Sequence, residues 1–131
     1  MNIFNIINDK QPDLEVFSDE RGVIVDILYN KNINHVAWIN SEPGAVRGNH
    51  YHKKTTQHTL LMAGSMDYHY ESLSAHIRGV RKVTPGDMVT SGPNEIHTMV
   101  FHEFSTILVF SEGPRGGKDY ESDTFRVPSI V

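Results

Sequence analysis

Two histidines, His50 and His52, stand two residues apart in the strand-like segment Val46–His52. Side chains at positions i and i+2 of a strand leave on the same face, roughly 7 Å apart along the strand. Two imidazoles that share one space can exchange protons near neutral pH or bind a metal ion. The spacing therefore predicts a site for one of these two chemistries inside a small barrel.

The composition limits the classes of function. The sequence has 131 residues and no cysteine, and 12 Lys and Arg stand against 16 Asp and Glu, for a net charge of -4. This charge has the wrong sign for a nucleic-acid-binding protein, so we expect no nucleic-acid partner. No apolar run approaches the roughly 18 residues of a membrane span and no leader-like segment is present, so we expect a cytoplasmic protein with no membrane partner. Residues 1–131 are predicted to form a single domain.

Short apolar segments separated by turn residues account for most of the chain. No window of about eleven residues shows a helical period, and one helical turn is expected near Lys118–Thr124. The strand-like segments are Gly22–Tyr29, Ile33–Asn40, Val46–His52, Gln57–Met62, Ser65–Glu71, Ala75–Val83, Met88–Ser91, Ile96–His102 and Thr106–Phe110. This pattern predicts an all-β fold, and specifically an antiparallel jelly-roll.

Alternation is clearest in Ser65–Glu71, where Met66, Tyr68 and Tyr70 share one face. If that face turns inward, Tyr68 and Tyr70 are candidate contacts for a substrate. Ordinary core packing is the alternative.

Two motifs resemble those of the cupin superfamily. The spacing Gly44-(x)5-His50-x-His52-(x)4-Gln57-(x)6-Gly64 is similar to the first cupin motif, with Gln57 where the family usually has Glu. The second motif is represented by Gly86-Asp87, Pro93 and His97, with Glu95 in place of a glycine. The resemblance implies a cupin-type antiparallel jelly-roll β-barrel.

A narrower resemblance, to the nucleotide-sugar 3,4-ketoisomerases, covers nearly the whole chain. It rests on Ser18–Gly22, Asn30–Ile33, Arg47–Lys54 with Gln57, Gly92-Pro93 with His97-x-Met99, and Asp119-Tyr120. More distantly, the chain resembles the dTDP-4-keto-rhamnose 3,5-epimerases. The resemblance implies an isomerase of deoxysugar or surface polysaccharide biosynthesis that moves the carbonyl of a nucleotide-linked 4-keto-6-deoxy sugar from C4 to C3. It also implies catalysis by His50 and His52 and pairing as a homodimer.

The residues themselves fit this chemistry. A hydrogen on C3, beside the C4 ketone, is acidic, so the reaction needs a base at C3 and a proton returned to C4, as a histidine pair can provide. The planar fork of Arg47 suits a diphosphate, although an ion pair with Glu42 or Asp87 is the alternative. Gln57 and His97 are further candidates for substrate binding.

Metal binding is the rival interpretation. His50, His52, Gln57 and His97 occupy the cupin ligand positions, and three imidazoles with an oxygen donor suit Zn²⁺, Fe²⁺ or Ni²⁺. Because Gln57 removes a charge that would offset the ion, and because the resemblance implies a metal-free enzyme, we predict no metal cofactor. A metal-binding cupin, as an epimerase or otherwise, and a non-catalytic sugar-binding cupin remain alternatives.

Two features depart from the expected pattern. The ketoisomerases tend to have Arg-Val-Tyr-Tyr where this chain has His35–Trp38, so a phenol is missing from that strand. Trp38 is expected to pack in the core or to stack on a base. Of Tyr29, Tyr51, Tyr68 and Tyr70, the last two are the favoured replacements. The apolar segment Met1–Ile7 is expected either to pair with a second copy or to fray.

Overall fold

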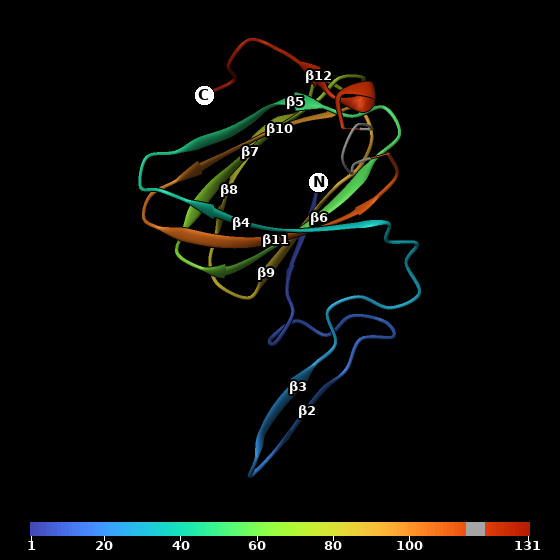
Figure 1. Ribbon diagram of the computed structural model, residues 1–131, viewed down its shortest axis with the longest axis vertical. Helices are drawn as coiled ribbons and strands as arrows, with labels where there is room; N and C mark the ends of the chain where they lie inside the picture. Colours follow the sequence, from blue (N-terminus) through green and yellow to red (C-terminus); the bar gives the residue numbers. More distant parts are fainter. Residues whose placement is uncertain (115–119) are drawn as a thin grey trace.

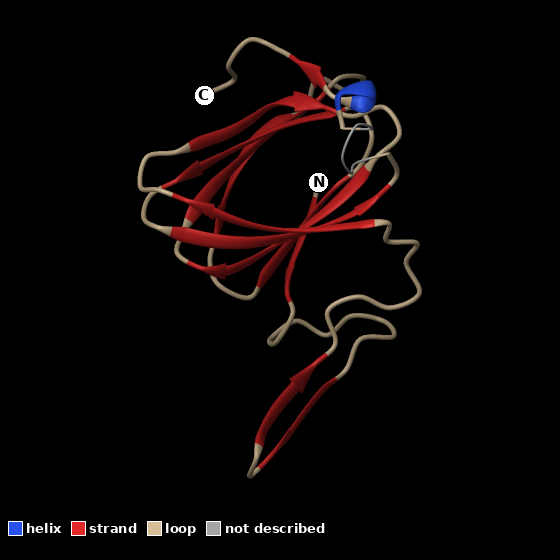
Figure 2. Cartoon of the chain, viewed as in Figure 1, coloured by secondary structure: helices blue, strands red, loops and turns tan. Residues whose placement is uncertain are grey.

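Two five-stranded antiparallel sheets face each other and form an open-ended barrel (Figures 1 and 2). The structure, a computed structural model, describes residues 1–114 and 120–131. The first sheet contains, in order, β1 (Asn2–Asn5), β9 (Asp87–Ser91), β6 (Thr56–Ala63), β11 (Ser105–Glu112) and β4 (His35–Ser41). The second contains β12 (Phe125–Arg126), β5 (Val46–Tyr51), β10 (Glu95–Phe101), β7 (Met66–Ser72) and β8 (Arg78–Val83).

The core lies between the two sheets, where alternate side chains of each strand meet. Leu61, Met66, Phe101 and Ile107 are fully buried, and burial of each such side chain contributes about 1.5–3 kcal/mol. The predicted alternation of β7 is confirmed, since Met66 and Tyr68 are buried and Tyr70 is partly buried against the same core. This packing makes the barrel a rigid support for the side chains at its open end.

A two-stranded arm projects away from the barrel (Figure 1). It consists of β2 (Val16–Asp19) and β3 (Gly22–Val25), which pair with each other in a separate sheet. Its exposed hydrophobic side chains are Val16, Phe17, Val23 and Ile24. The strand predicted for Gly22–Tyr29 is therefore shorter than expected and lies outside the barrel.

The other eight predicted strands all overlap strands of the barrel. β1, β2 and β12 were not predicted. β1 pairs with β9 of the same chain, with Asn2 opposite Thr90, so the first segment is an ordered edge strand and not a frayed tail. Its pairing with a second copy stays a prediction. No helix in the described part of the chain is long and apolar enough to cross a membrane.

A 3-10 turn, η2 (Glu121–Asp123), lies near the end of β5 (Figures 1 and 2). It corresponds to the described part of the helical turn expected at Lys118–Thr124, whose first two residues lie outside the described residues. After η2, β12 pairs with β5 and thereby places the C-terminal segment at the open end of the barrel.

Candidate functional site

Three imidazoles converge at the open end of the barrel. The ring centroids of His50 and His52 are 5.0 Å apart, and that of His97 lies 4.6 Å from His50 and 5.5 Å from His52. One ring nitrogen of each histidine lies within 4.8 Å of the corresponding nitrogens of the other two. The two rings are thus close together, as the spacing of His50 and His52 predicted, and His97 lies with them, as the second motif predicted.

Register and backbone shape bring His97 to the pair. His97 of β10 lies opposite His50 of β5, and the register shifts immediately afterwards, between His97 and Thr98. Gly48 has φ +114°, and a Cβ there would lie 2.4 Å from the carbonyl oxygen of His97. Only glycine permits this approach without displacing β10, so Gly48 fixes the separation of the two strands under the cluster.

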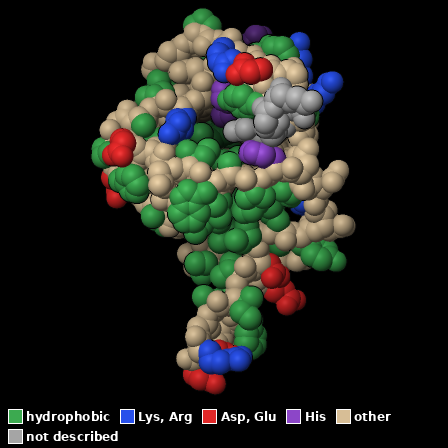
Figure 3. Space-filling model, viewed as in Figure 1, with side chains coloured by type: hydrophobic (Ala, Val, Ile, Leu, Met, Phe, Trp, Pro, Cys, Tyr) green, Lys and Arg blue, Asp and Glu red, His purple; other side chains and the backbone are tan. Residues whose placement is uncertain are grey.

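The cluster adjoins a cavity of about 320 Å³, a size within the usual range for small-molecule sites. Its lining residues are Ile39, Val46, Arg47, Gly48, His50, Gln57, Thr59, His97, Met99, Val109, Tyr120 and Arg126. Figure 3 shows histidine side chains at a hollow on this face of the molecule. His50 faces the cavity, whereas His52 is 3% exposed and lies behind it.

His52 is held in one tautomer by the C-terminal turn. Its Nδ1 lies 2.7 Å from the main-chain carbonyl oxygen of Asp123. Because a carbonyl only accepts, Nδ1 carries the hydrogen and Nε2 is the basic nitrogen of the ring.

The carboxylate of Asp123 fastens that turn to the loop after β5. It accepts hydrogen bonds from the main-chain N–H groups of Lys53, Lys54 and Thr55, and from the Thr55 hydroxyl at 2.8 Å. Burial alone raises the pKa of Asp123, but these four donors outweigh it, and the pKa is lowered below its usual value. The carboxylate is therefore ionised at neutral pH, and its negative charge stabilises the turn.

Arg47 presents a positive charge to the cavity. Its Nε donates to Ser41 Oγ at 2.8 Å and its Nη2 donates to the Asn40 carbonyl at 3.0 Å. Among the described residues it forms no ion pair, so the alternative partners Glu42 and Asp87 do not neutralise it. The guanidinium is thus oriented by neutral acceptors and retains its charge for an anion.

A second guanidinium, that of Arg126, lines the same cavity. It forms a two-point ion pair with Glu121, with both N···O distances at 2.8 Å. The pairing fixes the orientation of Arg126 next to η2.

Gln57 and His58 leave β6 on opposite faces. Gln57 lines the cavity and is 8% exposed, as predicted for an inward position. His58 lies behind the sheet, where Nδ1 contacts Thr90 Oγ1 and Nε2 contacts Glu112, both at 2.8 Å. The interpretation of His58 as a packing residue agrees with these contacts.

Neither Tyr68 nor Tyr70 lines the cavity. The ring of Tyr68 stacks on His97 with the centroids 6.2 Å apart, and burial raises its pKa, so it remains a protonated support behind the cluster. Tyr70 lines a separate hollow and lies over Gly79. Their predicted role as substrate contacts finds no support in this arrangement.

The position of Trp38 differs from the expectation that it packs in the core or stacks on a base. Trp38 is 64% exposed on the outer face of β4, where its Nε1 donates to Asn40 Oδ1, so it neither packs in the core nor approaches the cavity. The neighbouring inward position is occupied by Ala37, which has no hydroxyl.

Sequence reasoning did not identify Tyr120 and Arg126 as site residues. Tyr120 was noted only as part of the Asp119-Tyr120 resemblance, whose first residue lies outside the described residues. Arg126 belongs to a two-residue strand, which is too short to show alternation.

Comparisons with known proteins agree with this architecture. Residues 17–105, more than half of the chain, match the sequence family described as the polysaccharide biosynthesis C-terminal domain. A variant of a 3,4-ketoisomerase from Thermoanaerobacterium thermosaccharolyticum, in complex with TDP-4-keto-6-deoxyglucose, is 20% identical and has a TM-score of 0.71 over 96% of this chain and 88% of that chain. The TDP-quinovose 3,4-ketoisomerase from Campylobacter jejuni is 20% identical, with a TM-score of 0.74 over 96% and 93%. The predicted cupin-type antiparallel jelly-roll β-barrel is thereby confirmed as the fold.

One curated relative is a UDP-2-acetamido-2,6-beta-L-arabino-hexul-4-ose reductase from Pseudomonas aeruginosa, 28% identical over 61 residues. The match covers 47% of this chain and 16% of the reductase, so the chain spans a small part of that relative's length.

Proposed function

The chain belongs to the polysaccharide biosynthesis C-terminal domain family, and from this premise we propose that it is an isomerase of nucleotide-linked 4-keto-6-deoxy sugars. The reaction moves the carbonyl from C4 to C3. The observation that carries the proposal is the convergence of three imidazoles beside a cavity that also contains Arg47. Two structural neighbours are 3,4-ketoisomerases, and one of them was solved with TDP-4-keto-6-deoxyglucose, which supports this choice of substrate.

His50 acts as the base because, of the two predicted catalytic histidines, it is the one that lines the cavity. It removes the proton from C3, the electrons of the C3–H bond form the C3–C4 double bond, and the C4 oxygen takes the negative charge. The imidazolium then returns a proton to C4. His52, 5.0 Å away and fixed by Asp123, is the neighbouring base with which His50 exchanges that proton. A positioned general base of this kind contributes about 10²–10⁴-fold to the rate.

Arg47 provides the positive charge for the diphosphate. It lines the cavity, it forms no ion pair among the described residues, and a guanidinium can donate hydrogen bonds to phosphate oxygens. Arg126 lines the same cavity, but Glu121 already accepts hydrogen bonds from both of its terminal nitrogens. Binding energy gained at the diphosphate, away from the reacting carbons, holds the sugar in position against His50.

The test is conversion of TDP-4-keto-6-deoxyglucose followed by proton NMR. The wild-type protein is expected to produce the 3-keto sugar, and His50→Asn and His52→Asn are expected to lose this activity. The matched control is His76→Asn, an exposed histidine at positive φ in the turn between β7 and β8. No conversion of this or related keto sugars by the wild-type protein would contradict the proposal, and inversion at C3 or C5 without carbonyl movement would indicate an epimerase.

A metal centre is the second candidate, favoured by the cluster of nitrogens within 4.8 Å. Three nitrogens bound tetrahedrally to Zn²⁺ at about 2.0–2.1 Å lie roughly 3.4 Å apart, so small ring movements suffice. The three histidines, with Gln57 as oxygen donor, would hold the ion, and the contact of His52 with Asp123 resembles the hydrogen bonds that orient metal ligands. A bound ion would supply Lewis-acid polarisation of a sugar oxygen. Elemental analysis of purified protein, together with activity after treatment with a chelator, separates the two candidates.

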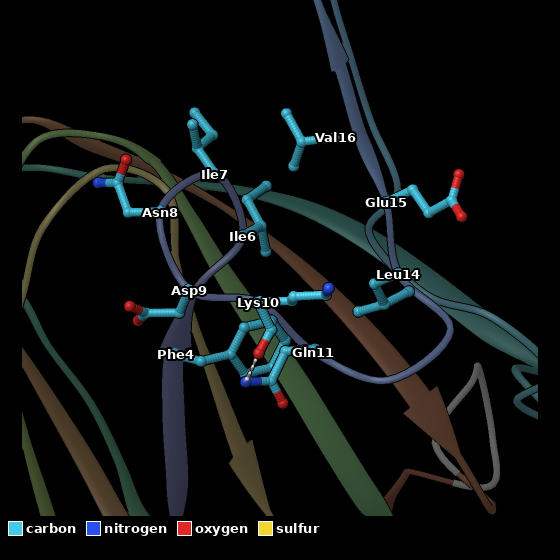
Figure 4. A pocket seen from close by; sticks show the side chains of 10 residues that line it. All are labelled: Phe4, Ile6, Ile7, Asn8, Asp9, Lys10, Gln11, Leu14, Glu15 and Val16. Carbon is cyan, nitrogen blue, oxygen red and sulfur yellow. Dashed lines mark hydrogen bonds between the residues drawn. The ribbon is translucent and has the colours of Figure 1, made fainter.

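We also propose that two copies of the chain pair as a homodimer through the arm. A cytoplasmic location stays a separate prediction. An isolated two-stranded ribbon is marginally stable in water, and the arm exposes Phe17 and Ile24 side by side in its register. A groove of about 410 Å³ lies at its base, lined by residues of β1, the loop after β1 and the start of β2 (Figure 4). Hydrophobic side chains gather where the arm meets the barrel (Figure 3), which supports a buried interface there.

A further inference from the structure

The C-terminal turn carries a phenol to the cavity. Tyr120, the residue before η2, is half-buried and lines the cavity next to His50. The two rings meet edge to face, with centroids 6.4 Å apart and an interplanar angle of 80°. Tyr120 thus stands on the substrate side of His50, whereas Asp123, which holds the same turn, supports His52 from behind.

Carbonyl migration requires a second proton transfer that the histidines do not account for. One proton moves from C3 to C4, and another must leave the hydroxyl on C3 and reach the oxygen on C4. Among the described residues that line the cavity, the side-chain hydroxyls belong to Tyr120 and Thr59. A phenol, with a reference pKa of about 10, is a much better proton donor than an aliphatic hydroxyl.

We propose that Tyr120 is a catalytic residue that transfers the oxygen-bound proton, an inference that rests on the proposed isomerase function. As His50 takes the proton from C3, the Tyr120 hydroxyl gives its proton to the C4 oxygen, and an enediol forms. The Tyr120 phenolate then takes the proton from the C3 oxygen as the His50 imidazolium returns a proton to C4. The carbonyl now lies at C3, and both side chains have recovered their starting protonation states.

Three contacts fix the position of Tyr120. The Thr124 hydroxyl donates to the Tyr120 carbonyl at 2.5 Å, which closes the turn on itself. The Asp123 carboxylate ties the turn to the loop after β5, and the Arg126–Glu121 pair holds its outer side. A group that transfers a proton must be held in a defined geometry, and these contacts supply it.

Tyr120→Phe tests the inference because it removes only the hydroxyl. The expected result is a loss of kcat of about 100-fold or more, with KM changed by less than about threefold. Binding of TDP and the thermal unfolding midpoint are expected to stay the same. The control is Tyr51→Phe, since the Tyr51 ring stacks on Phe125 and does not line the cavity, so this variant should keep wild-type activity.

The outcomes separate this inference from the function on which it rests. If the kcat of Tyr120→Phe lies within about threefold of the wild-type value, Tyr120 is not a catalytic residue and the isomerase proposal still stands. Absence of wild-type activity overturns both. If Tyr120→Phe fails to fold, replacement of Tyr120 by 3-fluorotyrosine decides: the more acidic phenol is expected to move the alkaline limb of the pH–kcat profile to lower pH, and an unchanged profile overturns the inference.

Discussion

The main-chain carbonyl of Asp123 accepts a hydrogen bond from His52 Nδ1 at 2.7 Å, although 71 residues separate the two positions in the chain. The same residue uses its side-chain carboxylate to anchor the C-terminal turn to the loop after β5. One residue therefore both fixes the tautomer of a site histidine and holds the turn that carries Tyr120. Stability of the turn and geometry of the site are linked through this contact.

Asp123→Asn is expected to lower the free energy of unfolding at pH 7 by about 2–3 kcal/mol, because hydrogen bonds to a buried charged group are lost. The folded-state pKa of Asp123 is lowered, so its contribution is fully present above the unfolded value of about 3.9 and is lost as the pH falls through the folded value. The destabilisation should therefore shrink with acidification. Urea unfolding of wild type and variant at pH 7 and at about pH 3 measures this difference. Asp13→Asn, at an exposed position, is the control, and an equal loss at both pH values contradicts the prediction.

Arg47→Met is expected to weaken binding of TDP about 10- to 100-fold, because charge-assisted hydrogen bonds contribute about 1.5–3 kcal/mol. The hydrogen bond to the Asn40 carbonyl is exposed and its loss should cost little, whereas Ser41 is buried and loses the donor to its Oγ, so a stability loss of about 1 kcal/mol is expected. Isothermal titration calorimetry with TDP gives the affinity. Lys82→Met removes an exposed positive charge on β8 and should leave the affinity unchanged. Equal affinities for Arg47→Met and wild type would exclude Arg47 from the binding site.

Gly48→Ala is expected to destabilise the fold by about 2–4 kcal/mol, because the new Cβ meets the His97 carbonyl and φ is strongly positive. The displaced β10 should also separate His97 from His50 and reduce activity. Thermal unfolding and the conversion assay report the two effects. Gly92→Ala is the matched control, since a Cβ at Gly92 meets nothing within 4 Å. If Gly48→Ala is as stable as Gly92→Ala, the fold does not need the close approach of Gly48 to the His97 carbonyl.

Phe17→Asp combined with Ile24→Asp is expected to convert the dimer to a monomer. The two side chains lie opposite each other in the arm and are 57% and 65% exposed, so charges there face solvent in a monomer but are buried in the proposed interface. Light scattering coupled to size-exclusion chromatography gives the mass. Ile77→Asp, at a similarly exposed position between β7 and β8, should keep the dimer. A monomeric wild-type protein rules out the interface.

The histidine cluster was predictable because its signals are local. Alternation along β5 places His50 and His52 on one face, and motif spacing identifies His97. The contribution of the C-terminal turn was not predictable, because Tyr120 and Arg126 reach the cavity through the contacts of Asp123 with residues 53–55, about 70 positions away.

Trp38 and the arm show a second limit. Alternation in His35–Ser41 correctly separates Ala37 and Ile39 from Trp38, but it does not say which face is covered. For the same reason the apolar residues of Gly22–Val25 predict a strand without showing that it leaves the barrel. Which face of a strand is buried depends on neighbours that are distant in the sequence.

Exchange of the C3 hydrogen in D₂O tests the proposed histidine chemistry most directly. TDP-4-keto-6-deoxyglucose is incubated with wild type, His50→Asn and the control His76→Asn, and the C3 signal is followed by proton NMR. Proton abstraction by His50 predicts loss of that signal with wild type and His76→Asn and its persistence with His50→Asn. Exchange that continues unchanged in His50→Asn, or that is absent with wild type, would contradict it.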